Sequence, residues 1–295
     1  DCGNVTTVTQ TITVNDITPP TASNPVAVNV ECIGDVPSTD ITVVTDEADN
    51  CTANPLVEWV NDISDGLSCP ETIIRTYSIT DDCGNVTTVT QTITVNDITN
   101  PTASNPAGVS VELITDVPAP DPTLVVDEAD NCTANPTVLF IGDVSDGLNC
   151  PETITRTYSV TDDCGNQILV TQTIIVSDLT LPTASNPLPE NVECIGDVSA
   201  SNPLVVTDEA DNSGVAPTVL WVGDVSDGLS CPETITRTYS VTDNCGNQIT
   251  VEQTIIVNDI TPPTASNPTA VNVECIGDVP PADITVVTDE ADNCT

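Results

Sequence analysis

A constant 81-residue period limits what this chain can fold into. The tripeptide Cys-Gly-Asn recurs on this step, starting at Cys2, Cys83, Cys164 and Cys245. Tyrosines follow the same step at Tyr77, Tyr158 and Tyr239. A fixed period of this kind marks a tandem array in which each period is one folding unit.

Recurrent Ser-Asn-Pro triplets divide the chain into three predicted repeats, 25–105, 106–186 and 187–267. Residues 1–24 then form the C-terminal part of a preceding repeat, and residues 268–295 the N-terminal part of a following one. The chain starts and ends within a repeat and contains no Met. We therefore expect it to be an internal piece of a longer array. No stretch is long and apolar enough to span a bilayer.

The charge of the chain excludes several kinds of partner. It has 45 acidic residues against three Arg, and neither Lys nor His. Such an acidic surface repels nucleic acid and anionic lipid, and it attracts cations. Thirteen cysteines in a chain of small repeats indicate an oxidising compartment. The sequence therefore predicts an extracellular, cell-surface protein that binds no nucleic acid and does not insert into a membrane.

The residue pattern of one repeat predicts an all-β fold. Thr, Val and Ile dominate, Pro and Gly mark turns, and helix signals are nearly absent. Strands are expected at 26–32, 40–44, 55–60, 72–80 and 86–95. Five to seven antiparallel strands in one repeat suggest an immunoglobulin-like β-sandwich with Trp59 and Tyr77 in its core. Short Pro-containing linkers predict an extended array.

Strand direction limits how the cysteines can pair. We call the end of a repeat that faces the preceding repeat its leading end, and the opposite end its trailing end. If each strand reverses the previous one, Cys51 and Cys83 lie at the leading end of the repeat, and Cys32 and Cys69 at the trailing end. A disulfide needs Cα atoms within about 7 Å, whereas a strand of about 30 Å separates Cys69 from Cys83. Other pairings stay open at this point. The favoured pairs are Cys51–Cys83, Cys132–Cys164, Cys32–Cys69 and Cys194–Cys231.

Two positions break the cysteine pattern. Leu113 and Ser213 stand where the period predicts cysteine. Pairing within repeats would then leave Cys150 and Cys245 without partners, as free thiols.

The segment "TITRTYSVTDDCGN", followed by "TQTIIV" and a Pro-Thr-Ala-Ser linker, resembles a known family. It is similar to the HYR-like, immunoglobulin-like repeats of giant bacterial surface adhesins, in particular those of gliding motility in Bacteroidota. The resemblance covers essentially the whole chain. It implies export by the type IX secretion route and a long filament that contacts the substratum.

The sequence gives no sign of catalysis. It lacks His and Lys, and its paired carboxylates recur in every repeat, whereas an active site is normally built once. Zinc is also disfavoured, because the cysteines stand singly, without the close Cys-x-x-Cys spacing of tetrahedral sites. We therefore predict a protein that is not an enzyme.

Acidic residues gather at the start of each repeat, in strings such as "DEADN". Ca²⁺ takes six to eight oxygen ligands, so a cation shared between a linker and the next repeat is one interpretation. A solvated acidic loop that caps turns through Asx hydrogen bonds is the other. The proposed ligands are Asp16, Asp46, Glu47, Asp49 and Asp81; Asp97, Asp127, Glu128, Asp130 and Asp162; and Asp178, Asp208, Glu209, Asp211 and Asp243.

The three arginines are the only basic side chains. Arg75, Arg156 and Arg237 each lie on the apolar face of a predicted strand, two residues before the repeated Tyr. They either bind a ligand or, as we favour, pack along the core edge against an aromatic ring or an acid.

These patterns favour a non-catalytic stalk segment of a surface adhesin. Rigid repeats would project contacts with the substratum or a surface polysaccharide away from the cell. Two alternatives stay open. One is an array of calcium-dependent carbohydrate-binding modules, and the other is a surface-coat or fibre subunit that self-associates laterally.

Overall fold

The computed structural model describes residues 2–294 and confirms the all-β fold. Three four-stranded sheets follow one another along the chain, and the described residues contain no α-helix. Within that range no helix is long and apolar enough to cross a membrane. The tandem β-sandwich architecture expected from the repeat period is therefore correct.

Each sheet is built from three long strands and one short strand. The first comprises β1 (Val28–Val30), β2 (Leu56–Ser64), β3 (Glu71–Thr80) and β4 (Val86–Val95). The second comprises β5 (Val109–Val111), β6 (Thr137–Ser145), β7 (Glu152–Thr161) and β8 (Gln167–Val176). The third comprises β9 (Glu190–Val192), β10 (Thr218–Ser226), β11 (Glu233–Thr242) and β12 (Gln248–Val257).

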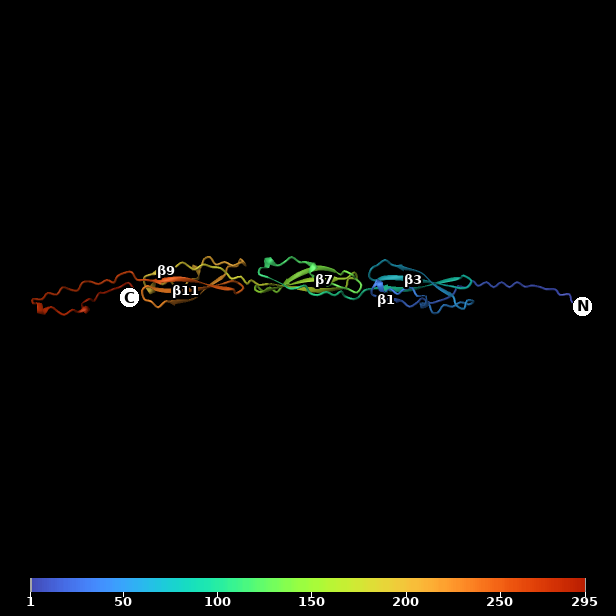
Figure 1. Cartoon of the computed structure of the whole chain (residues 1–295), viewed down its shortest axis with the longest axis horizontal. Helices are drawn as coiled ribbons and strands as arrows, with labels where there is room; N and C mark the ends of the chain where they lie inside the picture. The colour runs from blue at the N-terminus through green and yellow to red at the C-terminus, as the bar shows by residue number, and fades with distance from the viewer. Residues whose placement is uncertain (1, 295) are drawn as a thin grey trace. The chain divides into compact units, whose positions relative to one another are not determined.

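The strand order differs from the antiparallel arrangement predicted. In the first sheet the order is β1-β4-β3-β2, and β2, β3 and β4 form an antiparallel meander. The short strand β1 runs parallel to β4, with Val28 opposite Ile93. Because β1 and β4 point the same way, the residues after both strands lie at the trailing end of the repeat (Figure 1).

The strand expected at 40–44 is wrong, because this segment forms the 3₁₀ turn η2 (Ile41–Val43). The Asp40 carboxylate accepts a hydrogen bond from the Thr42 backbone N–H at 2.9 Å, which stabilises the turn against an extended strand. Short 3₁₀ turns recur at η1 (Ile33–Asp35), η3 (Ile114–Asp116), η4 (Pro122–Leu124), η5 (Ile195–Asp197), η6 (Pro203–Val205), η7 (Ile276–Asp278) and η8 (Ile284–Val286).

Tyr77 lies in the core as predicted and is fully buried. It packs with Ile79 and Val89 in one apolar cluster, while Ile73 and Ile93 belong to a second cluster. Buried Arg75 stands between these clusters along β3, opposite Gln91 on β4. The core of a repeat is therefore two small apolar clusters separated by a polar layer.

Trp59 was predicted in the core, and this prediction is wrong, because the side chain is 46% exposed. Trp59 lies on the edge strand β2, next to a β-bulge between Trp59 and Asn61. Its indole N–H donates to the Asp62 carboxylate at 3.0 Å. A bulge turns the strand locally, and an edge position leaves one side of the ring in water. Phe140 and Trp221 are also about half exposed.

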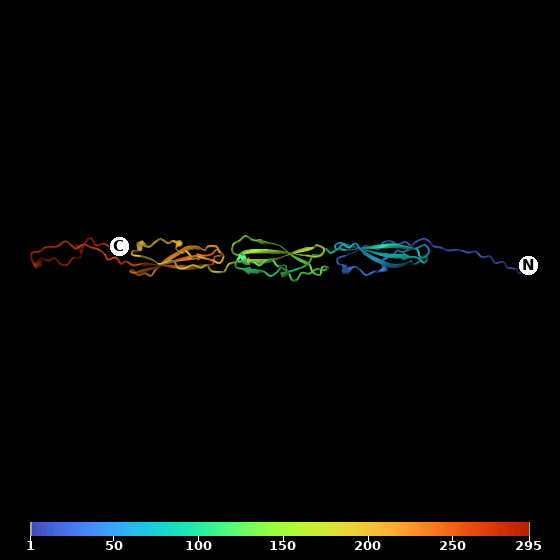
Figure 2. The same cartoon turned by 90° about the horizontal axis from the view of Figure 1, so that it is seen from above.

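By its internal contacts the chain divides into two compact units. Of the described residues, one unit comprises 2–108, 119–144 and 155–173, and the other 109–118, 145–154 and 174–294. The first contains the whole β1–β4 sheet and the second the whole β9–β12 sheet (Figures 1 and 2). Every disulfide and acidic group described below lies within one unit.

Candidate metal centres at the repeat joints

A joint is the place where the linker after one repeat meets two loops of the next repeat. Each joint takes one Asp from the linker, an acidic loop further along the chain, and the Cys-Gly-Asn turn between the last two strands. The linker residues of three joints are Asp16, Asp97 and Asp178. These joints are named after their linker residues.

An asparagine that sequence reasoning missed ties each linker to the turn. The Asn85 side-chain amide donates to the Asp16 main-chain carbonyl at 3.1 Å and to the Asp81 carboxylate at 2.7 Å. Asn166 and Asn247 make the same two contacts at their joints. The recurrence of Cys-Gly-Asn was the sequence signal for this residue.

At two of the joints, carboxylates from all three segments converge. Ligand atoms lie within 4.8 Å of one another in the groups Asp16, Asp49 and Asp81, and Asp178, Asp211 and Asp243. Two oxygens that both bind one Ca²⁺ at 2.3–2.6 Å are at most about 5 Å apart. The spacing therefore suits one hard cation in each group.

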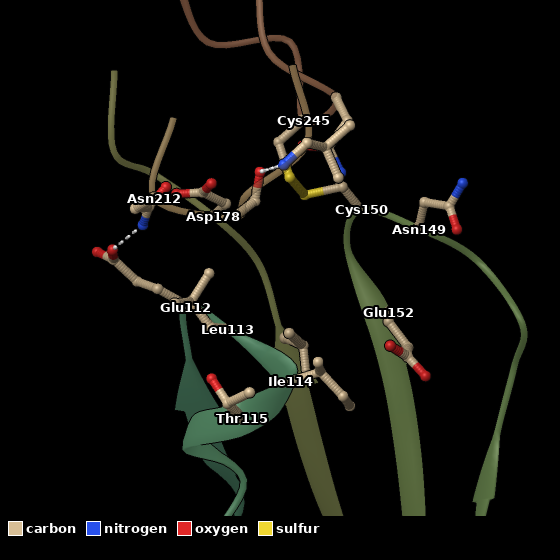
Figure 3. A pocket seen from close by; sticks show the side chains of 14 residues that line it. Glu112, Leu113, Ile114, Thr115, Asn149, Cys150, Glu152, Asp178, Asn212 and Cys245 are labelled. Carbon is tan, nitrogen blue, oxygen red and sulfur yellow. Dashed lines mark hydrogen bonds between the residues drawn. A yellow bond between two sulfur atoms is a disulfide. The ribbon is translucent and has the colours of Figure 1, made fainter. Parts of the chain in front are cut away.

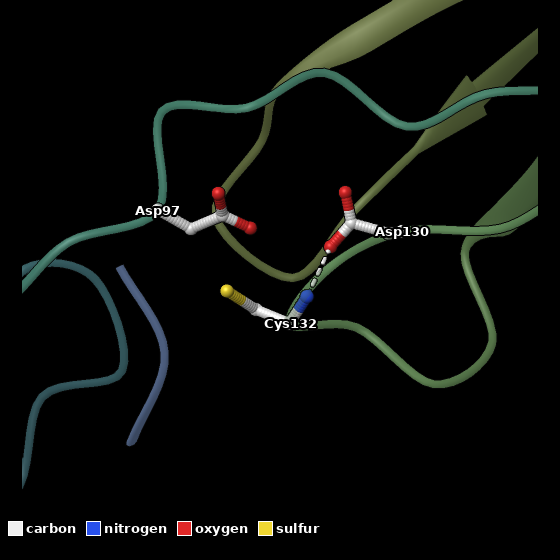
Figure 4. A group of neighbouring side chains, drawn as sticks. All are labelled: Asp97, Asp130 and Cys132. Atoms are coloured by element: carbon white, nitrogen blue, oxygen red, sulfur yellow. Dashed lines mark hydrogen bonds between the residues drawn. The ribbon is translucent and has the colours of Figure 1, made fainter. Parts of the chain in front are cut away.

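At the Asp97 joint the corresponding group is Asp97, Asp130 and Cys132. The Asp97 and Asp130 carboxylates face one another, and the Cys132 backbone N–H donates to Asp130 (Figure 4). The Cys132 sulfur is bonded to Cys32, so it offers no thiolate to a metal. The charged atoms that could bind a metal here are carboxylate oxygens, and these again favour a hard cation.

The same three carboxylate oxygens lack a hydrogen-bond partner at all three joints, although each is buried. They are Oδ2 of the linker Asp, Oε2 of the loop Glu and Oδ1 of the second loop Asp: Asp16, Glu47 and Asp49; Asp97, Glu128 and Asp130; Asp178, Glu209 and Asp211. Leaving a buried charged acceptor unpaired is costly. Asp97 and Asp178 are only 3% and 4% exposed. A cation would satisfy these oxygens.

The other oxygen of each aspartate is held in place by backbone donors. Asp16 Oδ1 accepts from the Thr18 N–H at 3.0 Å, and Asp49 Oδ2 accepts from Cys51 and Thr52 N–H groups at 2.8 Å. One oxygen thus fixes the side chain while the other stays available. The free carboxylate oxygens are therefore already positioned to bind a cation. The Asx hydrogen bonds expected for a solvated acidic loop are also present, and they are what holds the carboxylates in place.

Burial and like charge act on the buried linker residue. Burial raises the pKa of Asp97, and the nearby Asp130 and Asp162 carboxylates add to that rise. Burial also acts to raise the pKa of Asp130, but hydrogen bonds from the Thr133 and Cys132 backbone outweigh it and lower that pKa. Burial and the neighbouring carboxylates therefore oppose the ionisation of Asp97, and a bound cation would favour it.

Some predicted ligands have another role in the structure. Asp46, Asp127 and Asp208 are exposed, and each accepts a hydrogen bond from a serine backbone N–H, of Ser23, Ser104 and Ser185. Asp81, Asp162 and Asp243 each hold the turn asparagine. The first loop Asp therefore ties the loop to the linker and lies outside the converging groups of carboxylates.

The disulfides correct the pairing predicted from the sequence. They are Cys32–Cys132, Cys69–Cys164, Cys150–Cys245 and Cys194–Cys294, with sequence separations of 100 or 95 residues. The assignment of cysteines to the two ends was compatible with this result. However, a trailing-end cysteine bonds to the leading end of the next repeat, as with Cys32 and Cys132, whose Cα atoms are 5.1 Å apart.

Consequently Cys51 and Cys83 are unpaired, while Cys150 and Cys245, which were predicted to be free, are bonded to each other. The free cysteines among residues 2–294 are Cys2, Cys51, Cys83, Cys231 and Cys275. None of these five cysteines has another free cysteine at a separation of 95 or 100 residues.

The joint at Asp178 has one disulfide where the Asp97 joint has two. Leu113 and Ser213 occupy the second pair of positions, and both line a cavity of about 340 Å³. The Cys150–Cys245 disulfide lies on one side of this cavity and a hydrogen bond between Asn212 and Glu112 on the other (Figure 3).

A glutamate before each trailing-end cysteine position also crosses the joint, and sequence reasoning missed it. Glu31 accepts from the Thr99 hydroxyl at 2.6 Å and from the Asn131 amide at 2.9 Å. Glu112 and Glu193 make equivalent contacts. The only available signal was its fixed place in the period.

The arginines serve the fold, as favoured from the sequence. Arg75 pairs with Asp62 at 2.9 Å, Arg156 with Asp143 at 2.9 Å and Arg237 with Asp224 at 2.8 Å. The Arg156 guanidinium also lies 5.9 Å from the centre of the Phe140 ring. Each arginine is thus a buried cation with its own acidic partner.

Comparison with known proteins gives one family match. Residues 182–257 match the family of HYR-like domains with 4 cysteines. This match covers about a quarter of the chain, in its third repeat, and it supports an extracellular repeat domain. No curated protein matches the sequence.

Among solved structures, the chain is similar to Drosophila N-cadherin EC1-3, with 15% identity and a TM-score of 0.33, covering 81% of this chain and 100% of that one. It is similar to protocadherin gammaB7 EC3-6 with 10% identity and a TM-score of 0.30, covering 82% and 78%. Similarity at this level shows no shared function.

Proposed function

We propose that the chain is a non-catalytic stalk segment of an extracellular adhesin, in which Ca²⁺ and disulfides fix each repeat to the next. Its joints recur at even steps, whereas an active site would occur once. The function is mechanical: the stalk holds adhesive contacts away from the surface that bears it.

One observation carries the calcium part of the proposal, namely the three unpartnered carboxylate oxygens found at each of the three joints. Without a cation, two such charges about 4 Å apart repel by about 4 kcal/mol at an effective dielectric near 20. A divalent cation converts this repulsion into coordination. Because its ligands come from the linker and from the following repeat, binding restricts the angle between them.

The finer identity rests on the sequence resemblance alone. On that basis the chain belongs to a gliding-motility adhesin of Bacteroidota, exported by the type IX route, whose filament contacts the substratum or a surface polysaccharide. Lateral self-association of filaments is a further part of this proposal.

A second candidate is an array of calcium-dependent carbohydrate-binding modules. The exposed aromatic side chains Trp59, Phe140 and Trp221 favour it, because sugars stack on such rings. Glycan-array binding that is lost when all three become Ala would support this function over the stalk.

Small-angle scattering of the chain in Ca²⁺ and in chelator tests the stalk. We expect a rod in Ca²⁺, and greater flexibility with a smaller mean dimension in chelator. A compact particle in Ca²⁺ would contradict the stalk. A rod whose dimensions and flexibility are the same in chelator would contradict only the role of the cation.

A further inference from the structure

The long central strand of the middle repeat lies between two cysteines that are both bonded to other repeats. Strand β7 lies between Cys150 and Cys164, which are only fourteen residues apart in the sequence. Cys164 is bonded to Cys69 of the preceding repeat and Cys150 to Cys245 of the following one. The same spacing separates Cys69 from Cys83 around β3, and Cys231 from Cys245 around β11.

This connectivity creates a covalent route that is much shorter than the chain itself. Tension that reaches Cys69 passes through the disulfide to Cys164, runs backwards along β7 to Cys150, and leaves through the disulfide to Cys245. The route uses fourteen residues of the middle repeat, whereas the polypeptide needs the whole 81-residue period to advance by one repeat.

The short route has almost no slack. Fourteen residues span at most about 50 Å when fully extended. Ten of them already form β7, where each residue advances by about 3.3 Å. An unbridged 81-residue repeat could instead lengthen to about 280 Å on unfolding.

We infer that the Cys69–Cys164 and Cys150–Cys245 disulfides make β7 the force-carrying element between Cys69 and Cys245, so that tension entering at Cys69 and leaving at Cys245 cannot lengthen the middle repeat even when its core unfolds. The conclusion depends on disulfide connectivity and not on calcium. It therefore goes beyond the proposed stalk function and can fail separately from it.

Force spectroscopy on the full chain, held at its termini, tests this inference. In the variant Cys32→Ser with Cys194→Ser, only Cys69–Cys164 and Cys150–Cys245 remain. The shortest covalent path between the termini then runs from residue 1 to Cys69, backwards along β7 from Cys164 to Cys150, and from Cys245 to residue 295. It contains about 132 residues and should stretch to about 450 Å. In the unaltered chain the shortest path between the termini runs instead through the Cys32–Cys132 and Cys194–Cys294 disulfides, and the chain should reach only about 320 Å.

The control adds Cys150→Ser to that variant, which breaks the route at one end of β7. Its stretched length should rise to about 680 Å, and reductant should bring every variant to about 1,000 Å. A two-bridge variant that reaches about 680 Å or more before reduction would overturn the inference. So would an unaltered chain whose length is the same with and without reductant.

Discussion

Leu113 and Ser213 line the same cavity, and they occupy the two positions that carry a disulfide one period earlier and one period later. Their separation in the sequence equals that of the bonded pair Cys32 and Cys132. Both members of one pair lack cysteine together, which is what pairing across the joint requires. Pairing within repeats would have left two unrelated gaps.

Replacing both residues, Leu113→Cys with Ser213→Cys, should therefore create a fifth disulfide. Closing a long loop typically stabilises a protein by about 2–4 kcal/mol. We expect a higher melting temperature under oxidising conditions, with the new bridge identified by peptide mapping. Leu113→Cys alone should give a reactive thiol and no such gain, and a double variant that stays reduced would argue against this geometry.

Asp97→Asn should have opposite effects with and without calcium. The folded-state pKa of Asp97 is raised by burial, so its ionisation costs stability once the pH rises above the unfolded value near 3.9. In chelator at pH 7, the variant should melt at a higher temperature than the unaltered chain. In Ca²⁺ it should melt at a lower temperature and bind at least about tenfold more weakly.

Glu58→Gln is the matched control for this experiment, because Glu58 is an exposed acid on β2 and belongs to none of the converging groups of carboxylates. It should leave both melting temperatures unchanged. If Asp97→Asn and Glu58→Gln behave alike in a calorimetric calcium titration, the joint acids are ordinary surface charge.

The arginine pairs predict an acid-sensitive contribution to stability. Hydrogen bonds from Arg75 and Arg237 lower the pKa of Asp62 and Asp224 respectively. A lowered folded-state pKa gives stability that is present above the unfolded value near 3.9 and is lost as the pH falls through the folded value. Asp62→Asn with Asp224→Asn should cost about 1–3 kcal/mol per pair at pH 7.

Denaturant titrations at several pH values check this prediction. The stability difference between the double variant and the unaltered chain should shrink as the pH falls from 5 to 2. A difference that stays constant over this range would show that the two carboxylates do not titrate differently in the folded state.

The repeated tyrosines should respond differently to removal of the hydroxyl. The Tyr158 hydroxyl accepts the Asp121 backbone N–H at 3.2 Å, whereas no backbone group donates to Tyr77. Tyr158→Phe should thus cost about 1 kcal/mol or more, because it removes the partner of that N–H. Tyr77→Phe should be nearly neutral in the same denaturation assay, and equal losses would contradict the assigned hydrogen bond.

Much of the fold could be predicted from the sequence because it depends on period and alternation. The 3₁₀ turn at Ile41–Val43 could not, since it depends on one Asp40 hydrogen bond that competes with β-propensity. Trp59 was misplaced because hydrophobicity alone cannot locate an edge strand or a bulge.

The acidic joints were predictable as clusters but not atom by atom. The strings of Asp and Glu indicated that the linker and loop converge, as Asp16 and Asp49 do. Which acid would point inward depended on local backbone donors, and Asp46 was held elsewhere by Ser23. The cysteine pairing failed because only partners within a repeat were considered, although the matched absence of cysteine at Leu113 and Ser213 was visible.

Covalent linkage between neighbouring repeats is the central claim, and non-reducing peptide mapping by mass spectrometry tests it most directly. Alkylating the folded chain before digestion keeps the native pairs in place. We predict peptides that link Cys32 to Cys132, Cys69 to Cys164, Cys150 to Cys245 and Cys194 to Cys294. Peptides that link Cys32 to Cys69, or alkylation of Cys150 without reduction, would contradict it.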